Sequence, residues 1–267
     1  MKTFIKNTVI YLFGHENART LKKFFASKGF SEDDLILKYF EANPRKGIMF
    51  DVGVHYGQSF IEYAKMGWQI IGFEPDPINR KYVPKVKNLK LYENAVSDQD
   101  GLELSFYRSR QSTGISSLTP FEKHHKLITT VKTITLSTVI EIERVDTIDY
   151  LKIDIEGHDF FALKGFPFSK LQPEIIMCEF EDFKTIPLGY TYKDMANLLV
   201  CQDYDVWLSE WYPLRRYGAE RIWRDIRTYP TPLFDGNANG NLVAIKKRNG
   251  NKFKLSMESY LSTIKNA

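Results

Sequence analysis

Hydrophobic positions follow two different spacings along the chain, and the change lies near residue 45. From residue 17 to residue 40 apolar side chains recur at helical spacing, and Ser31 before three acidic residues has the position of a helix N-cap. Beyond it, short apolar runs bounded by Gly, Pro or Asp alternate with helical patterns. These runs are residues 48–50, 69–73, 89–96, 150–155 and 174–180. Such alternation is typical of βαβ units, so the sequence predicts an α/β fold with N-terminal helices.

The middle of the chain predicts a hairpin and a loop. Asp100-Gly101 is a turn signal, and the alternation over residues 102–107 predicts a half-exposed strand. Residues 108–129 are polar and interrupted by Gly and Pro, which predicts a loop able to close over a site. Residues 131–136 are rich in β-branched side chains and are expected to return to the sheet.

The later elements complete an alternating pattern. A helix is expected over residues 192–200, and strands over residues 204–208 and 242–245. We therefore expect three parts, which are a helical segment at 1–45, a main domain at 46–250 with an aromatic and Arg-rich insertion at 211–236, and a tail at 251–267.

Composition narrows the classes of protein. A chain of 267 residues with 43% hydrophobic content can bury a full core, and its formal net charge of +4 is too small to indicate a nucleic-acid partner. No run reaches the ~20 apolar residues of a transmembrane helix, and residues 1–14 predict an amphipathic helix rather than a secretory signal. Cys178 and Cys201 have no companion cluster, which indicates free thiols and a cytoplasmic protein.

The first strand runs into a turn that suits a ligand. After residue 50 the chain continues as Asp51-Val52-Gly53-Val54-His55-Tyr56-Gly57. Glycines at a strand-to-helix turn let a ligand approach the backbone. The spacing is G-x-x-x-G rather than G-x-G-x-x-G, which disfavours an NAD-dependent oxidoreductase because no further glycine admits a pyrophosphate. Asp51 at the strand end suits an ammonium group, such as that of S-adenosylmethionine.

The next two strands supply further polar groups. Glu74, followed by Pro75, stands 21 positions after Gly53, close to the ~20 expected for a carboxylate that binds a ribose. The third strand ends near Ser97 and Asp98, where a short polar side chain can meet an adenine amino group. Separately, the glycine pair can serve packing alone and Glu74 can serve a helix dipole. Together, these features predict S-adenosylmethionine binding.

An ordered set of motifs runs from about residue 48 to residue 179. These motifs are Phe50-Asp51-Val52-Gly53 with Gly57, Phe73-Glu74-Pro75-Asp76-Pro77, Ala95-Val96-Ser97-Asp98 with Gly101, Ser116-Ser117-Leu118, and Leu151-Lys152-Ile153-Asp154-Ile155-Glu156-Gly157. In them the chain resembles the FkbM-type methyltransferases. The resemblance implies a doubly wound, mostly parallel seven-stranded sheet of the class I methyltransferase type, which is Rossmann-like. It also implies S-adenosylmethionine as donor and usually O-methylation of glycans, lipid-linked sugars or natural products.

The resemblance also implies roles for single residues. Asp51, Gly53 and Gly57 would line the methionine side, Glu74 the ribose and Asp98 the adenine, with Asp154 and Glu156 beside the sulfonium. The chain departs from the family pattern at His55, where Asn is common, and at Ser137, where Asp often follows Thr-Leu. The candidate cofactor residues are Asp51, Gly53, His55, Gly57, Glu74, Pro75, Ser97, Asp98 and Asp154.

Three candidate catalytic residues lie at the end of the fourth strand. Asp154, Glu156 and His158 fall within five positions, where open α/β sheets bind ligands. Methyl transfer needs in-line alignment, and a hydroxyl acceptor gains from a nearby base. We expect Asp154 or Glu156 to orient the acceptor, and His158 or one of these carboxylates to remove its proton. Alternatively, Glu156 caps the next helix and His158 is solvated.

A metal-dependent mechanism is a second possibility. Asp154, Glu156, Glu179 and Glu181 carry the oxygen ligands that Mg²⁺ prefers, and a bound Mg²⁺ would acidify a diol. We treat this as the minor alternative and assign no metal ligand.

We expect the insertion at 211–236 to form part of the acceptor wall, with Arg215, Arg216 and Tyr217 among its residues. It is crowded with Trp, Tyr and Arg, which suit sugar rings and anionic groups. It equally suits a packed subdomain or an oligomer contact, and the oligomeric state stays open. The sequence therefore predicts an O-methyltransferase for a sugar, glycan or related small-molecule hydroxyl. A catalytically silent cofactor-binding partner is the alternative from another class.

Overall fold

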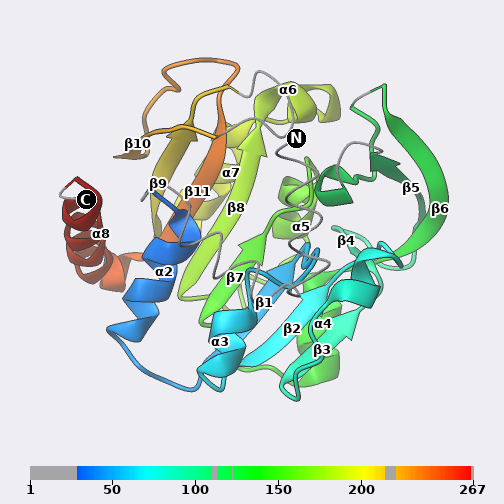
Figure 1. Ribbon diagram of the computed structural model, residues 1–267, viewed down its shortest axis with the longest axis horizontal. Coiled ribbons are helices and arrows are strands. Elements are labelled where there is room, and N and C mark those ends of the chain that lie inside the picture. The colour runs from blue at the N-terminus through cyan, green and yellow to red at the C-terminus, as the bar shows by residue number, and fades with distance from the viewer. Residues whose placement is uncertain (1–28, 110–112, 122, 214–220, 266–267) are drawn as a thin grey trace, which may run out of the picture.

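An eight-stranded sheet forms the centre of the protein. The computed structural model describes residues 29–109, 113–121, 123–213 and 221–265. Spatial order in the main sheet is β10-β9-β11-β8-β7-β1-β2-β3 (Figure 1). Its strands are β1 (Ile48–Val52), β2 (Gln69–Phe73), β3 (Leu89–Tyr92), β7 (Tyr150–Ile153), β8 (Ile175–Glu181), β9 (Tyr204–Trp211), β10 (Trp223–Thr228) and β11 (Asn239–Lys246).

The main sheet is mixed, which corrects the expected seven-stranded and mostly parallel arrangement. Strands β8, β7, β1, β2 and β3 are parallel neighbours, whereas β11 pairs antiparallel with both β8 and β9. The eighth strand, β10, comes from the insertion at 211–236 and pairs antiparallel with β9. A strand edge with unpaired backbone groups readily takes up another strand, and the insertion supplies one within the same chain.

A second, three-stranded sheet has the order β4-β6-β5. Its strands are β4 (Ala95–Val96), β5 (Glu103–Ser109) and β6 (His125–Ile134). Residues 131–136 therefore do not return to the main sheet as expected, and residues 89–96 divide between β3 and β4. The reason is that half of the residues of β6 are exposed, whereas central parallel strands are covered on both faces. The expected loop at 108–129 is correspondingly shorter, because β6 already begins at His125.

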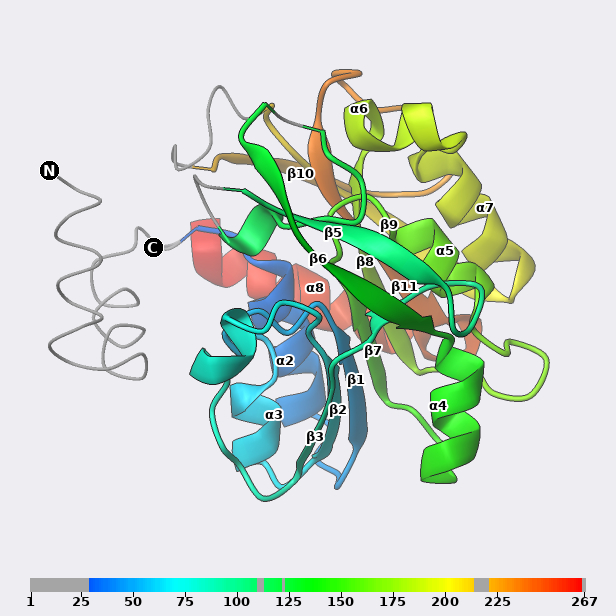
Figure 2. The same cartoon turned by 90° about the vertical axis from the view of Figure 1, so that its right-hand side faces the viewer.

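Helices cover both faces of the main sheet, so the doubly wound expectation is confirmed (Figure 2). One face carries α2 (Glu32–Glu41), α3 (Ile61–Lys65) and α8 (Gly250–Lys265), and the other carries α4 (Leu136–Glu143), α5 (Asp159–Lys164) and α7 (Tyr192–Cys201). Alternate residues of β1 serve the two cores, because Met49 packs with the first set and Phe50 with the second. The short helix α6 (Asp182–Thr185) follows β8, and 3₁₀ turns η1 to η4 occupy Asn79–Tyr82, Thr113–Ile115, Ile186–Leu188 and Lys247–Asn249.

The two ends of the described chain pack together. Ser31 caps α2 as predicted, because its Oγ accepts a hydrogen bond from the Asp34 backbone at 3.3 Å. Residues 250–265, where only a tail was expected, form helix α8, whose Phe253 is fully buried beside α2. The Tyr260 hydroxyl accepts a hydrogen bond from the Ser31 backbone at 3.2 Å. The helix expected at residues 1–14 lies outside the described residues.

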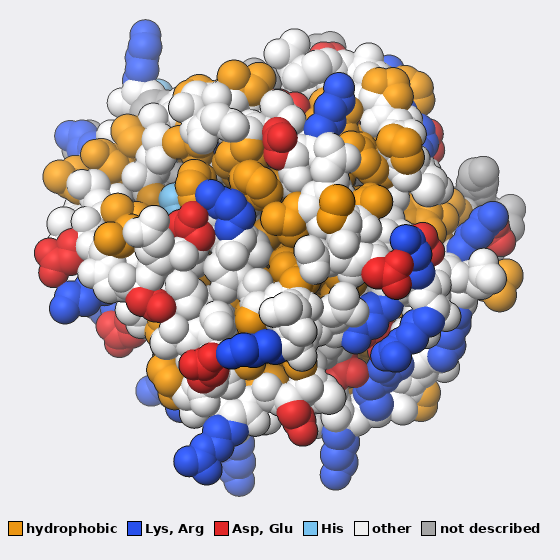
Figure 3. Space-filling model, turned by 180° about the vertical axis from the view of Figure 1, so that it is seen from behind, with side chains coloured by type: hydrophobic (Ala, Val, Ile, Leu, Met, Phe, Trp, Pro, Cys, Tyr) orange, Lys and Arg blue, Asp and Glu red, His pale blue; other side chains and the backbone are white. Residues whose placement is uncertain are grey.

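The surface of the protein excludes few kinds of binding partner. Among the described helices, none is both long and apolar enough to cross a membrane. On the face shown in Figure 3, several basic side chains gather at the lower right, and elsewhere basic, acidic and uncharged side chains are interspersed.

Helix α8 is expected to contribute strongly to stability. Phe253→Ala should lower the free energy of unfolding by about 3–5 kcal/mol, because it leaves a cavity between α2, α8 and the sheet. Leu255→Ala on the same helix is the control, since Leu255 is 67% exposed and should change stability by less than about 0.5 kcal/mol. Urea denaturation measures both, and equal effects of the two substitutions would contradict the packing role of α8.

Candidate functional site

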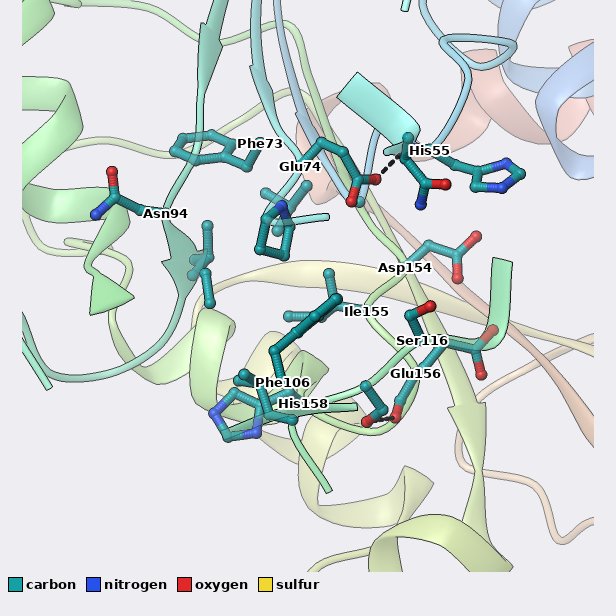
Figure 4. Close-up of a pocket in the computed structure, with 18 of the residues that line it drawn as sticks. His55, Phe73, Glu74, Asn94, Phe106, Ser116, Asp154, Ile155, Glu156 and His158 are labelled. Carbon is teal, nitrogen blue, oxygen red and sulfur yellow. Dashed lines mark hydrogen bonds between the residues drawn. The ribbon is translucent and has the colours of Figure 1, made fainter. Parts of the chain in front are cut away.

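A cavity opens where the order of parallel strands reverses between β7 and β1 (Figure 4). Ligands of open α/β sheets bind at such a point, beside the carboxyl ends of the strands. Figure 4 shows Phe73 and Asn94 on one side of the cavity and Asp154, Ser116 and Glu156 on the other. The lining includes seven predicted residues, which are Gly53, His55, Glu74, Pro75, Asp154, Glu156 and His158.

At Gly53 the chain leaving β1 comes very close to the chain leaving β7. A Cβ atom at this position would lie 2.0 Å from the backbone oxygen of Asp154, and the residue has a φ of +94°. Only glycine satisfies both conditions. Gly57, with a φ of +77°, donates from its backbone to the Val54 oxygen at 2.8 Å and closes the turn without lining the cavity.

Glu74 joins the ends of β1 and β2. Its carboxylate accepts hydrogen bonds from the backbones of His55 at 2.7 Å and Asp76 at 2.8 Å. Burial raises the pKa of Glu74 to about 7, although both hydrogen bonds act to lower it. The Asn79 side chain also forms a hydrogen bond with Glu74. A carboxylate has about four lone-pair positions, so Glu74 can still accept a hydrogen bond from a ligand hydroxyl.

Asp51 lies beneath the cavity rather than in its wall. It is fully buried, accepts a hydrogen bond from Ser59, and stands opposite Lys152 in the β1 and β7 pairing. Burial raises its pKa, and the Lys152 ammonium acts in the opposite direction. Asp51 therefore supports the floor of the site through Lys152.

The predicted adenine residues also lie behind the wall. Asp98 pairs with Lys164 at 3.1 Å, and although burial acts to raise its pKa, this ion pair lowers it. Ser97 is buried, and its Oγ lies 3.2 Å from Nε2 of His158. The cavity wall at this end is instead formed by Phe73, Asn94, Ala95 and Val96. The residues just before Ser97 and Asp98, rather than these two residues, therefore reach the cavity.

Sequence reasoning did not assign Asn79, Phe106 or Leu118 to the site. Asn79 is 2% exposed, lines the cavity, and has no hydrogen-bond partner for its Oδ1 among the described residues. Its position in the sequence, five residues after Glu74, could have indicated that it lies near the site. Phe106 and Leu118 reach the cavity only because the small sheet folds over the end of the large one.

Carboxylates gather at the end of β7. One oxygen from each of Asp154, Glu156 and Glu179 lies within 4.8 Å of the others. Lys152 donates to Asp154 at 3.0 Å, and Lys184 donates to Glu156 at 2.5 Å and also pairs with Glu181. Two buried ammonium groups thus neutralise part of this cluster.

The carboxylates of the cluster differ in acidity. Although burial acts to raise the pKa of Asp154, the neighbouring Lys152 holds it below its usual value. Burial raises the pKa of Glu179 to about 7, with Lys184 acting against it and Asp154 in favour. In the described part of the chain the Glu179 carboxylate makes no hydrogen bond or ion pair. Of the three carboxylates, Glu179 is therefore the one without a hydrogen bond or ion pair to a described residue.

The carboxylates of this cluster are arranged to pair with lysine ammonium groups rather than to bind Mg²⁺. Glu181 does not join the three clustered carboxylates, and the Lys184 ammonium lies between Glu156 and Glu181 where a cation would need them. The two lysines already supply positive charge that compensates these carboxylates, so the proposed mechanism below uses no metal ion.

His158 is largely buried. Its ring stacks on Phe161 at 4.3 Å, and burial lowers its pKa to about 4. The imidazole is therefore neutral at pH 7. His158 rather than Glu156 occupies the N-cap position of α5, and neither the helix-capping role for Glu156 nor a solvated His158 is observed.

The described part of the aromatic and Arg-rich insertion packs against β9 and against its own aromatic rings. Arg224 and Arg227 pair with the fully buried Glu210 and lie over the Phe234 ring. Arg221 lies over the Trp211 ring at 5.0 Å. Arg215, Arg216 and Tyr217, which belonged to the expected acceptor wall, lie outside the described residues.

Comparison with known families gives one match. The family described as "Methyltransferase FkbM domain" matches residues 51–206, which is more than half of the chain. No curated protein matches the chain.

Solved structures show distant similarity. Magnesium protoporphyrin IX methyltransferase from Synechocystis PCC 6803 is 8% identical with a TM-score of 0.42, over 91% of this chain and 97% of that one. Precorrin-6y C5,15-methyltransferase from Geobacter metallireducens GS-15 is 12% identical with a TM-score of 0.40, over 83% and 93%. A TehB-like methyltransferase from Corynebacterium glutamicum ATCC 13032 is 13% identical with a TM-score of 0.38, over 87% and 97%.

The contact at Gly53 gives a stability prediction. Backbone strain alone costs about 1–3 kcal/mol at a residue with this φ. Gly53→Ala should lower the free energy of unfolding by more than that, because the added Cβ also collides with the Asp154 backbone. Gly67→Ala is the matched control, since Gly67 has a φ of +81° and no atom near a built Cβ. Thermal unfolding of both variants separates strain from collision. Equal losses would show that the approach of β1 to β7 is not sterically limited.

Proposed function

Because the chain belongs to the FkbM methyltransferase family, we propose that it transfers a methyl group from S-adenosylmethionine to a hydroxyl oxygen of a sugar, glycan or related small molecule. The observation that carries this proposal is one cavity bounded by Glu74 on one side and by Asp154 and Glu156, at the end of β7, on the other. A nucleoside ligand and an acceptor hydroxyl need these two kinds of group side by side.

The residues of the cavity fit the nucleoside. Glu74 offers a remaining lone pair to a ribose hydroxyl, and the buried Oδ1 of Asn79, which has no partner among the described residues, offers a further acceptor. Phe73 and Asn94 bound the adenine end, while Gly53 and His55 bound the methionine end. When bound, S-adenosylmethionine supplies a methyl group activated by a positively charged sulfur.

Asp154 and Glu156 are suited to orienting the acceptor. Lys152 and Lys184 fix their carboxylates, and an in-line displacement depends on such fixed geometry. A neutral, buried His158 with a pKa of about 4 is a weak base, which favours a carboxylate as the proton acceptor.

A catalytically silent binding protein is the second candidate. It is favoured by His55, which stands where the family commonly has Asn, and by the lysines that pair with two of the carboxylates. Turnover distinguishes the two candidates, since a silent protein binds S-adenosylhomocysteine without producing methylated material.

Glu74 makes cofactor affinity depend on pH. An ionised carboxylate accepts hydrogen bonds better than a protonated one, so ligand binding favours ionisation of Glu74. The affinity for S-adenosylhomocysteine should therefore rise as pH increases through about 7, by at most about tenfold per pH unit, and level off above it. Calorimetry from pH 5.5 to 8.5 measures this. Glu74→Gln should bind more weakly without the slope, and an unchanged slope would remove Glu74 from the site.

Methyl transfer itself is tested with labelled donor and fractionated cell glycans, lipids and small molecules, followed by mass spectrometry. The wild-type protein should give labelled product, and Asp154→Ala should reduce the rate about a hundredfold while S-adenosylhomocysteine affinity changes far less. Glu141→Ala serves as control, because Glu141 pairs with Lys170 on the exposed surface of α4. Cofactor binding without any labelled product would support the silent protein instead.

A further inference from the structure

A second cavity of about 210 Å³ adjoins the first at the same edge of the main sheet. Asp154 lines both cavities. The other residues that matter here are Asp33 on α2, Lys152 on β7, Glu179 on β8, Asn241 on β11 and Arg221 before β10. An acceptor must approach the donated methyl group from the side opposite the sulfur, so its site has to adjoin the cofactor cavity. The shared Asp154 meets that requirement.

The charges of this second cavity point to one chemical class. Both of its cations are engaged, because Lys152 pairs with Asp154 at 3.0 Å and Arg221 donates to Asn239 at 2.8 Å. Two of its carboxylates, Asp33 and Glu179, have no hydrogen bond or ion pair within the described ranges. Unpaired carboxylates accept hydrogen bonds from hydroxyl groups and repel phosphates and carboxylates.

The carboxylates also differ in what they can do. Asp154 is held by Lys152, and Glu156 is held by Lys184. Glu179 lies in the same cluster, within 4.8 Å of both, and it lines the second cavity. A base must be within hydrogen-bond reach of the proton that it removes. Glu179 lies in the cavity wall and pairs with none of the described residues, so it is available for that role.

Resting on the proposed function, we propose that the second cavity is the acceptor site, that it takes an uncharged, hydroxyl-rich group rather than a phosphorylated one, and that Glu179 removes the acceptor proton. The acceptor oxygen forms a bond to the methyl carbon as the carbon–sulfur bond breaks, and the electron pair of that bond stays on sulfur. The hydroxyl proton passes to the Glu179 carboxylate and afterwards to water. Burial raises the pKa of Glu179 to about 7, which supports this role because the most effective general bases have a pKa near the working pH.

The class of acceptor is tested with the wild-type protein. Labelled product from a cell extract is passed over anion and cation exchangers. Product retained by neither column is the expected result. Product found only in the anion-retained fraction would overturn the uncharged acceptor.

The place of binding is tested without turnover. Asn241→Cys, in a Cys201→Ser background, puts one reactive thiol in the second cavity, because Cys178 is fully buried. Iodoacetamide alkylation is followed with S-adenosylhomocysteine present, with and without the uncharged extract fraction that gives product. The fraction should slow alkylation at least threefold. An unchanged rate would place the acceptor elsewhere.

The role of Glu179 is tested by substitution. Glu179→Gln should lower the transfer rate about a hundredfold or more and leave S-adenosylhomocysteine affinity within twofold of wild type. Glu179→Asp, which keeps the carboxylate, should lie between, and Glu141→Gln is the surface control. A Glu179→Gln protein with wild-type turnover would overturn the proposal. If Glu179→Gln does not fold, Glu179→Asp and the alkylation experiment still decide.

These outcomes distinguish a failure of the proposed function from a failure of the inference about the second cavity. A wild-type protein that does not bind S-adenosylhomocysteine, or binds it without producing any labelled material, contradicts the proposed function itself. A wild-type protein that is active but fails in product charge, thiol protection or Glu179 dependence contradicts only the inference about the second cavity.

Discussion

The arrangement at the end of the parallel strands depends on one buried ammonium group. Lys152 is 6% exposed and donates to Asp154 at 3.0 Å, and it stands opposite Asp51 in the β1 and β7 pairing. A charge removed from water is tolerated only with opposite charges around it, and the loss of one partner costs about 3–5 kcal/mol. The carboxylates raise the pKa of Lys152 despite the opposing effect of burial. Lys152 therefore links the floor of the first cavity and the wall of the second through its charge interactions with Asp51 and Asp154.

Backbone geometry is the second constraint on the site. His55 and Glu156 have φ values of 52° and 56°, which non-glycine residues rarely adopt, and both line the first cavity. Each is held from outside its own turn. The Glu74 carboxylate accepts from the His55 backbone, Ser117 donates to the Glu156 backbone oxygen at 3.0 Å, and Lys184 holds the Glu156 side chain. Such strain persists only where the surroundings fix it, and it is concentrated at functional sites.

Several residues that sequence patterns predicted for cofactor binding line the first cavity. Gly53, His55, Glu74 and Asp154 reach the first cavity because strand ends and tight turns have local signatures, and parallel strands bring those ends to one edge. Asp51 and Asp98 belong to the same motifs but point into supporting ion pairs or hydrogen bonds. Spacing along a strand fixes which residues are near the edge, whereas the direction of each side chain depends on the element packed against it.

The sequence by itself determined the alternation of strands and helices, the two-sided covering of the sheet and the glycine turn after β1, because each follows from local spacing and backbone freedom. Only the tertiary structure decided the eight-stranded order, the separate sheet of β4, β5 and β6, and the packing of α8 on α2. Only the tertiary structure also decided which carboxylates are paired. Asp33, Asp154 and Glu179 come from three elements, and Lys184 reaches Glu156 from 28 residues away. Ion pairing depends on distance in space, which a linear pattern does not encode.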